Sequence, residues 1–152
     1  MPQTYLLVGG NLNNTLEKFE QLFSLLQGRV GGIVQKSSYY QSDAWGFESE
    51  HSFINIALCL QTELSPFELL KETQSIEKEL GRTEKTTTNY QDRTMDIDII
   101  FYDSEIIKTP NLEIPHPKMH LRDFVLTPLC EIASDFIHPI LEKSVCALRH
   151  KW

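Results

Sequence analysis

The order of apolar and polar residues along this chain predicts strands and helices in alternation. A short apolar run over 4–8 predicts a first strand, and the glycines and asparagine at 9–11 indicate a turn after it. From about Thr15, apolar residues recur at helical spacing up to Gly28, which is typical of a helix closed by glycine. A second strand is predicted over 33–41, and the polar segment behind it is expected to be a loop.

A third strand, Phe53 to Thr62, predicts two different faces because alternate residues of a strand share a face. The more apolar face contains Ile54, Ile56, Leu58 and Leu60, and the other contains Phe53, Asn55, Ala57, Cys59 and Gln61. The clearest helix start follows, with Ser65 as the cap, Pro66 in the first turn and Glu68 completing a capping box. We expect this helix to end at Gly81.

Residues 82–94 are polar and lack periodicity, which predicts a long loop of the kind that usually has a function. A further strand is expected over 95–102, weak strand material up to 114, and a short helix over 125–133. The order β-α-β-β-α-β is typical of a ferredoxin-like α+β sandwich, with an antiparallel sheet, both helices on one face and additions at the C-terminus. We expect the other face to be open or covered by loops, and residues 1–152 to form a single domain.

Composition narrows the classes of function. With 14 Lys and Arg against 21 Asp and Glu, the net charge is −7, which argues against a nucleic-acid binder or a protein that binds anionic membranes. No segment is long and apolar enough to suggest a membrane span, and the first residues do not resemble a signal peptide. Three cysteines, an odd number and far apart, suggest neither a disulfide framework nor a zinc site. We therefore expect a cytoplasmic protein. We also expect it to be a monomer.

The strand over 95–102 contains two acidic residues in a run otherwise rich in Met and Ile. Met95, Ile97, Ile99 and Phe101 are expected to point toward the helices, which leaves Asp96 and Asp98 side by side on the other face. Two carboxylates this close suit a hard cation such as Mg²⁺, held together with phosphate oxygens. The alternative, a polar strand face in water, is favoured when the motif is taken alone.

Basic residues on both sides of this strand favour the metal interpretation. Arg82, Lys85 and Arg93 precede it, and His116, Lys118, His120 and Arg122 follow it. Because Arg and Lys bind phosphate oxygens, the combination predicts a site for a metal-bound polyphosphate. Phe53, Asn55 and Phe124 would suit a flat heterocycle by stacking and edge hydrogen bonds. Taken alone, the two aromatic residues are more typical of a core. No P-loop motif is present.

Several segments resemble, in order, the 6-hydroxymethyl-7,8-dihydropterin pyrophosphokinases of folate biosynthesis. They are "VGGNL", "FINIA", "QSIEKELGR", "DRTMDIDII" and "IPHPKMHLRDF", and they extend from residue 8 to about residue 131. The resemblance implies a ferredoxin-like fold and transfer of pyrophosphate from ATP to the pterin hydroxymethyl group, with release of AMP and with two Mg²⁺ ions. The usual G-S-N turn of the family is here Gly9-Gly10-Asn11.

The same resemblance implies roles for individual residues. Asp96 and Asp98 would bind the metal ions, and Arg82 and Arg93 would contact the phosphates and assist catalysis. The ATP site would include Gln74, Glu77, Lys85, Ile99, His116 and Arg122. The pterin site would include Ser42, Ala44, Trp45, Phe53, Asn55 and Phe124. The alternative function is a non-catalytic ferredoxin-like module that binds a nucleotide or a protein on its open sheet face.

Overall fold

The computed structural model describes residues 1–11, 15–43, 52–82 and 95–149, which form one layered unit. The strands are β1 (Gln3–Asn11), β2 (Gly31–Lys36), β3 (Tyr40–Asp43), β4 (Ser52–Thr62), β5 (Met95–Tyr102), β6 (Ile107–Lys108) and β7 (Glu113–Ile114). The helices are α1 (Thr15–Arg29), α2 (Pro66–Glu77), the π-helix η1 (Lys78–Arg82), the 3-10 helix η3 (Met119–Leu121), α3 (Asp123–Ile132) and α4 (Val145–Arg149).

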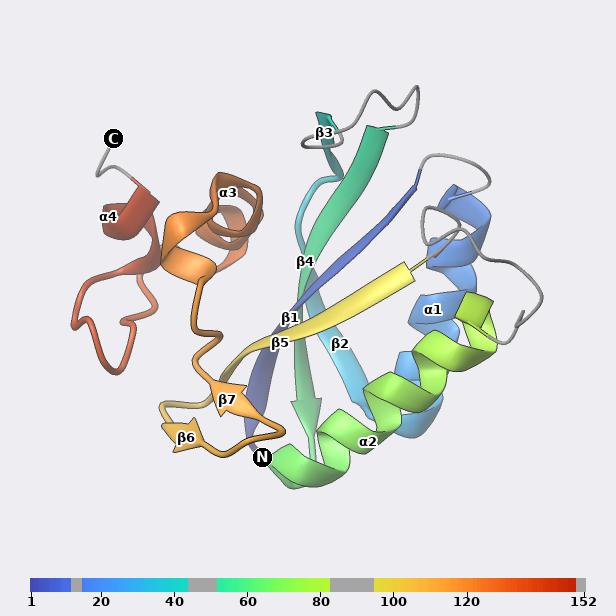
Figure 1. The fold of residues 1–152 in the computed structure, drawn as a ribbon, viewed down its shortest axis with the longest axis horizontal. Helices are drawn as coiled ribbons and strands as arrows, with labels where there is room; N and C mark the ends of the chain where they lie inside the picture. Colours follow the sequence, from blue (N-terminus) through green and yellow to red (C-terminus); the bar gives the residue numbers. More distant parts are fainter. Residues whose placement is uncertain (12–14, 44–51, 83–94, 150–152) are drawn as a thin grey trace.

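The main sheet has the order β2-β4-β1-β5, with β3 pairing beside β2 on the same edge of β4. All of its ladders are antiparallel, and α1 and α2 lie together on one side of it (Figure 1). This is the predicted ferredoxin-like α+β arrangement, in which β2 with β3 takes the place of one strand. The split occurs at Ser37, which is buried and bonds both its amide and its hydroxyl to Ala57 of β4.

The core between the sheet and α1–α2 follows the predicted pattern. Ile56, Leu58 and Leu60 of β4 face this core together with Leu22 and Leu69 from the helices. The capping box at the start of α2 is present, since Ser65 and Glu68 exchange side-chain and backbone hydrogen bonds. The helix does not stop at Gly81, however, because its last turn widens into the π-helix η1, which ends one residue later.

The prediction that the second face is open or covered by loops is wrong, because helix α3 covers part of it and α4 packs against α3 (Figure 1). Ala57 and Cys59 of β4 pack there against Val125, Leu126 and Leu129 of α3 in a second core. The sheet is therefore buried on both faces along its lower half.

Strand β5 contains a β-bulge that moves Phe101 to the unexpected face. Tyr5 pairs with Phe101 and Leu6 with Ile99, so Ile100 is an extra residue without a partner in β1. Ile97 and Ile99 consequently face α1 and α2, as predicted, whereas Ile100 and Phe101 belong to the second core. The expectation that Phe101 points toward those helices assumed an uninterrupted alternation.

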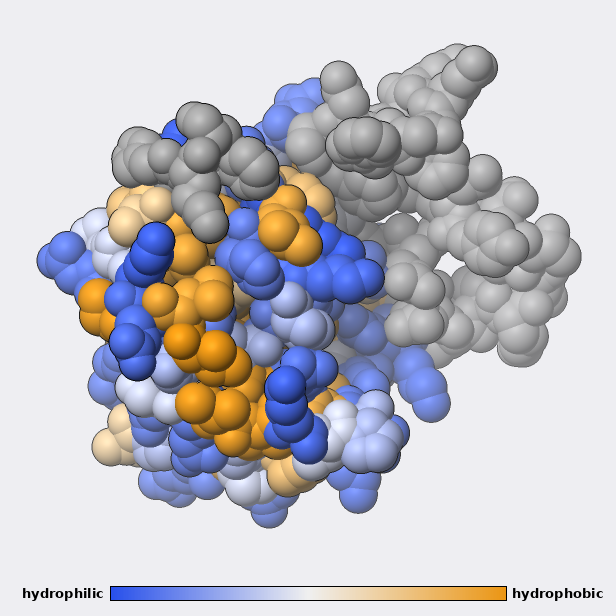
Figure 2. Space-filling view, turned by 60° about the vertical axis from the view of Figure 1, so that its left-hand side comes forward, coloured by the Kyte–Doolittle hydropathy of each residue, from blue (hydrophilic) through white to orange (hydrophobic). Residues whose placement is uncertain are grey.

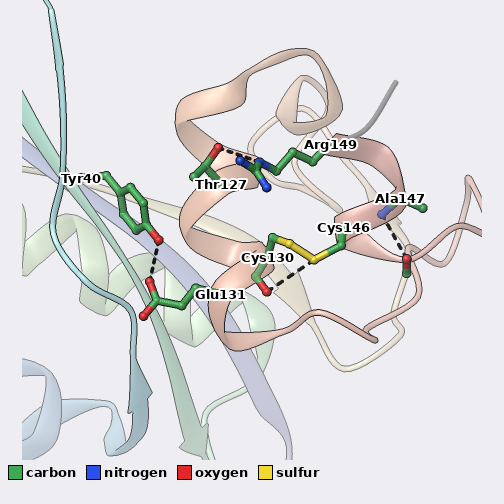
Figure 3. The surroundings of a disulfide bond; sticks show 8 residues. Tyr40, Thr127, Cys130, Glu131, Cys146, Ala147 and Arg149 are labelled. Atoms are coloured by element: carbon green, nitrogen blue, oxygen red, sulfur yellow. Dashed lines mark hydrogen bonds between the residues drawn. A yellow bond between two sulfur atoms is a disulfide. The ribbon is translucent and has the colours of Figure 1, made fainter. Parts of the chain in front are cut away.

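Cys130 and Cys146 form a disulfide, contrary to the expectation from the number and spacing of the cysteines (Figure 3). Their Cα atoms are 4.9 Å apart, and the bond joins α3 to α4. Cys59 is a buried free thiol. Cys130 lies near the end of α3, and the fold brings Cys146 of α4 beside it.

Figure 2 turns the α3–α4 side forward and shows apolar residues as a stripe among hydrophilic ones. The exposed large apolar residues in this part of the chain are Leu121, Phe124, Ile137, Ile140 and Leu141. Among the described residues, no helix combines the length and the apolar character needed to cross a membrane.

Candidate active site

One row of paired residues crosses three adjacent strands of the sheet. It consists of Asn55, Gly9 and Asp96. Gly9 of β1 pairs with Asn55 of β4 on one side and with Asp96 of β5 on the other. Residues directly opposite each other in antiparallel strands present their side chains on the same face, here the face on which α3 lies. The register thus brings the predicted pterin-reading amide and the first predicted metal ligand to either side of a glycine.

The sequence analysis did not predict the place of Gly9 in this row. The segment 9–11 was expected to be a turn, but β1 continues through Asn11, so both glycines lie in the strand. A Cβ atom at Gly9 would lie 2.5 Å from Oδ1 of Asn55, well inside contact distance. The absence of a side chain at this position therefore makes room for the amide of Asn55, which is itself buried.

Asp96 and Asp98 lie on the predicted face of β5. Met95, Ile97 and Ile99, which alternate with them, are buried in the core against α1 and α2. The two carboxylate residues are half-buried on the opposite face. A second row adjoins the first, because Leu7 of β1 pairs with Asp98. The prediction that both carboxylate residues lie on one face is confirmed, and their role as metal ligands stays a prediction.

The pair of aspartates fits a hard cation that takes its remaining ligands from a substrate. Mg²⁺ is usually bound through one or two carboxylates together with phosphate oxygens and water. The described part of the chain contains no group of three or more His, Cys, Asp or Glu side chains placed to hold a metal. Two carboxylates on one strand suit a metal that takes its remaining ligands from a polyphosphate.

His116 lies along the outer edge of β5, the strand that carries the aspartates. Its amide donates to the carbonyl of Ile100 at 3.1 Å, which fixes the segment after β7 along the edge of the strand. Burial lowers the pKa of His116, the negative charge of Asp98 opposes this shift, and the positive charge of Arg122 adds to it. These opposing effects show that the histidine, one aspartate and one arginine share an electrostatic environment.

Arg122 and Phe124 flank the first residue of α3. The guanidinium carbon of Arg122 lies 5.7 Å from the centre of the Phe124 ring, a distance typical of a cation–π contact. Phe124 is 39% exposed, so it is not the ordinary core residue of the alternative interpretation. The ring is available at the surface of the site face.

Three further residues of the predicted ATP site lie on α2 or on the face of β5 toward the helices. They are Gln74, Glu77 and Ile99. Gln74 is exposed on α2, and Glu77, one turn later, is buried with its carboxylate accepting the amide of Ile97 at 2.7 Å. The side chain of Ile99 is buried in the core. A nucleotide could therefore reach only the main chain of this residue.

The remaining predicted residues are described in part or not at all. Arg82 ends the π-helix η1, a kind of distortion that is frequent at functional sites. Ser42 of β3 pairs with Phe53 of β4 in the row next to Asn55. Lys85, Arg93, Ala44 and Trp45 lie outside the described residues.

Glu131 of α3 anchors the strand that leads to the predicted pterin loop (Figure 3). Its carboxylate accepts the amide of Ser38 at 2.9 Å and the hydroxyl of Tyr40 at 2.7 Å. The hydrogen bond from Tyr40, followed by that from Ser38, lowers the pKa of Glu131. Nothing in the local sequence indicates this contact, because it joins residues about ninety positions apart in the chain.

This chain is similar to known proteins of one family over most of its length. Residues 5–134 match the family described as 7,8-dihydro-6-hydroxymethylpterin-pyrophosphokinase (HPPK). A 2-amino-4-hydroxy-6-hydroxymethyldihydropteridine pyrophosphokinase of Porphyromonas gingivalis is 42% identical over 141 residues, covering 91% of this chain and 95% of that protein. The protein of the same name from Aquifex aeolicus is 40% identical over 136 residues, covering 90% of this chain and 81% of that protein.

Solved structures agree with the fold. The wild-type HPPK-DHPS of Plasmodium falciparum superimposes with a TM-score of 0.77 at 15% identity, covering 99% of this chain and 44% of that one. An HPPK-DHPS in complex with substrates gives a TM-score of 0.78 at 13% identity, covering 97% of this chain and 42% of that one. This chain thus spans less than half of those longer proteins and shares its fold with that part.

Proposed function

Because this chain belongs to the 7,8-dihydro-6-hydroxymethylpterin-pyrophosphokinase family, we infer that it transfers pyrophosphate from ATP to 6-hydroxymethyl-7,8-dihydropterin in folate biosynthesis. The acceptor is the hydroxymethyl oxygen of the pterin, and the second product is AMP. The row formed by Asn55, Gly9 and Asp96 carries this inference, because it brings a heterocycle-reading amide next to a metal-binding carboxylate. The alternative of a non-catalytic binding module is set aside by the enzymes at about 40% identity.

In this reaction the pterin oxygen attacks the β-phosphorus of ATP. A bond forms between that oxygen and the phosphorus, and the bond from the β-phosphorus to the oxygen bridging it to the α-phosphate breaks. The bridging oxygen leaves with AMP, and the hydroxyl proton is lost to the surroundings. Because phosphoryl transfer depends mainly on positioning and charge neutralisation, cations and fixed geometry are the contributions that the protein can make.

Asp96 and Asp98 are the residues that would hold two Mg²⁺ ions with the phosphate chain. When bound, these ions would neutralise charge on the phosphates and favour ionisation of the attacking hydroxyl. The two carboxylates contribute by facing the site from one strand, half-buried, while the alternate residues anchor that strand in the core.

Arg82 and Arg93 would stabilise the negative charge that develops on the transferred group and on AMP. Gln74, Lys85, Ile99, His116 and Arg122 would form the ATP site, whereas the carboxylate of Glu77, which was expected there too, accepts the amide of Ile97 in β5. The charges of Asp98 and Arg122 both influence the pKa of His116, which supports a common location for these three side chains. The segment 83–94 lies outside the described residues, so its contribution remains an expectation from the sequence.

The pterin would lie between Phe53 and Phe124, with Asn55 hydrogen-bonded to its edge. The exposure of Phe124 supports this role, because a ring that is already packed in a core could not stack on a ligand. Ser42, Ala44 and Trp45 would line the same site. Glu131 supports this arrangement by anchoring Tyr40, two residues before Ser42 in β3.

The deciding experiment measures AMP and ADP separately with purified protein, ATP, Mg²⁺ and 6-hydroxymethyl-7,8-dihydropterin. We expect AMP and no ADP, and loss of turnover in Asp96→Ala and in Asp98→Ala while both variants stay folded. Asp135→Ala removes an exposed carboxylate between α3 and α4 and serves as the control with normal turnover. Formation of ADP, or near-normal activity in either site variant, would refute the proposal.

We further propose that the protein works in the cytoplasm as a monomer, with small molecules as its substrates and without nucleic acid or membrane as a partner. Its net charge of −7 supports the exclusion of nucleic acid and anionic membranes as partners. Light scattering behind size-exclusion chromatography, with and without both substrates, tests the oligomeric state. A dimeric mass at micromolar concentration would contradict it.

A further inference from the structure

Strand β5 is the edge strand of the described sheet, so the backbone groups on its outer side need partners from elsewhere. Two such partners flank the predicted metal site. The amide of Ile97, which lies between Asp96 and Asp98 in the chain, donates to Oε2 of Glu77 at 2.7 Å. The carbonyl of Ile100 accepts the amide of His116 at 3.1 Å.

Glu77 is an unusual residue for the first of these contacts. It is the last residue of α2 and is only 9% exposed, so its carboxylate is almost removed from water. A buried carboxylate is costly unless it accepts good hydrogen bonds, and a bond from an amide to a charged acceptor is shorter and stronger than a neutral one. The contact therefore holds the main chain of β5 more tightly than an ordinary edge contact.

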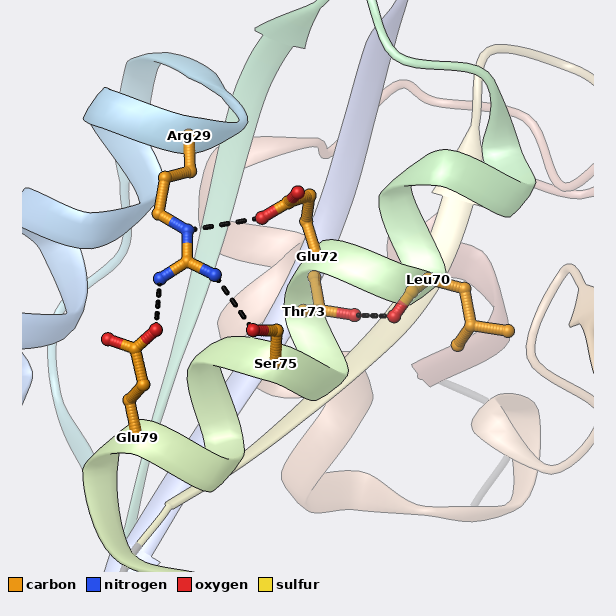
Figure 4. A network of polar contacts seen from close by, with 6 residues as sticks. All are labelled: Arg29, Leu70, Glu72, Thr73, Ser75 and Glu79. Carbon is orange, nitrogen blue, oxygen red and sulfur yellow. Dashed lines mark hydrogen bonds and ion pairs between the residues drawn. The ribbon is translucent and has the colours of Figure 1, made fainter.

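Glu77 also stands at a junction between two parts of the proposed site. The π-helix η1 begins at the next residue and ends at Arg82. Helix α1 supports this turn, because Lys18 donates to the carbonyl of Leu80 at 3.1 Å and Arg29 bonds Glu79. Arg29 also bonds Glu72 and Ser75 of α2, so its guanidinium connects the helix with the π-helical turn (Figure 4).

We propose that Glu77 is a positioning residue that fixes the strand carrying Asp96 and Asp98 against the end of α2. This inference rests on the proposed function and changes the role expected for Glu77 from a nucleotide contact to support of the metal-binding strand. Through one hydrogen bond, Glu77 sets the place of the two carboxylates relative to the turn that ends at Arg82. Because the reaction depends on alignment, a displacement of about 1 Å at this strand is enough to lower the rate about a hundredfold.

Two variants separate this role from direct contact with ATP. Glu77→Gln keeps an acceptor for the amide of Ile97 but removes the charge, and Glu77→Ala removes the acceptor. Glu63→Gln is the matched control, because it removes an exposed carboxylate from the turn just before α2. Each protein is tested for the proton chemical shift of the Ile97 amide, for kcat, and for binding of ATP in EDTA, where no metal is present.

If Glu77 positions β5, the Ile97 amide resonance shifts upfield in Glu77→Gln and further in Glu77→Ala. The value of kcat then falls about tenfold in the first variant and about a hundredfold in the second, while metal-free ATP affinity stays within about twofold. The control keeps the wild-type resonance and rate.

An unshifted Ile97 amide in Glu77→Gln overturns the proposal, as does metal-free ATP binding that weakens in proportion to kcat, which would indicate a nucleotide contact. If Glu77→Ala does not fold, Glu77→Gln decides the matter. A wild-type protein that releases no AMP refutes the proposed function instead, and the resonance of Ile97 still reports on the contact.

Discussion

Replacing Gly9 by alanine would place a methyl group in the row between the proposed pterin-reading amide and the first metal-binding carboxylate. The new Cβ would lie 2.5 Å from Oδ1 of Asn55, whereas ordinary contacts begin at 3.4 Å. The amide must therefore withdraw by about 0.9 Å, a distance large enough to break a hydrogen bond to a ligand edge. Asn55 is only 6% exposed, so it has little room in which to find a new position.

The expected cost falls on pterin recognition. Loss of one neutral hydrogen bond costs about 0.5–1.5 kcal/mol, and a misplaced group beside the ligand brings the total near the upper end of that range. We therefore expect kcat/KM for the pterin to fall about tenfold, the equivalent of about 1.4 kcal/mol. Overpacking next to a buried amide also lowers the free energy of unfolding by about 1 kcal/mol.

The assay varies the pterin at saturating ATP and Mg²⁺ and measures AMP. A double-mutant cycle with Asn55→Ala tests the route of the effect, because Gly9→Ala should cost little once the amide that it displaces has been removed. Gly28→Ala is the control, since a Cβ atom there meets nothing within 4 Å. Costs that simply add in the double variant, or an unchanged kcat/KM in Gly9→Ala, would refute this reasoning.

Three further predictions concern stability. Gly31→Ala should lower the free energy of unfolding by about 2 kcal/mol or more, because its Cβ would overlap the carbonyl oxygen of Gln61, whereas Gly32→Ala, with open space around it, should cost far less; urea unfolding compares them. Reduction of Cys130–Cys146, 16 positions apart, should cost about 3 kcal/mol, and Cys146→Ser should show no further loss in reductant. His138 has its pKa lowered by burial, and its Nδ1 accepts two amides, so it is neutral when folded. Its contribution to stability should be complete above pH about 6.5 and be lost as the pH falls through the lower folded value, a slope that would be weaker in His138→Asn.

Local patterns predicted most of the architecture. The strand over 95–102, the capping box of α2 and the two faces of β4 all agree with the structure. Each of these features depends on residues close together in the chain. The facing of Asp96 and Asp98 succeeded for the same reason, since the alternation is undisturbed between Met95 and Ile99.

The wrong or missing predictions concern features that local patterns do not determine. Glycine is uncommon within strands, so the pair at 9–10 suggested a turn, although glycine in a strand often marks close approach by another group. The helical pattern of α3 could not show which surface the helix would cover. The contact of Glu131 with Tyr40 and the bond between Cys130 and Cys146 join residues that only the fold brings together.

The extra residue at Ile100 has a consequence for how this strand can change during evolution. Asp98 and Phe101 are three positions apart and would point to opposite faces of a regular strand, yet the bulge puts both on the side of α3. Deletion of Ile100 would leave Asp98 and Phe101 two positions apart, so a regular strand would keep both of them on the side of α3 and Tyr102 on the opposite side. We therefore expect a shortening of the chain by one residue to be tolerated best at Ile100, whereas the same deletion elsewhere in β5 would turn every following side chain to the other face.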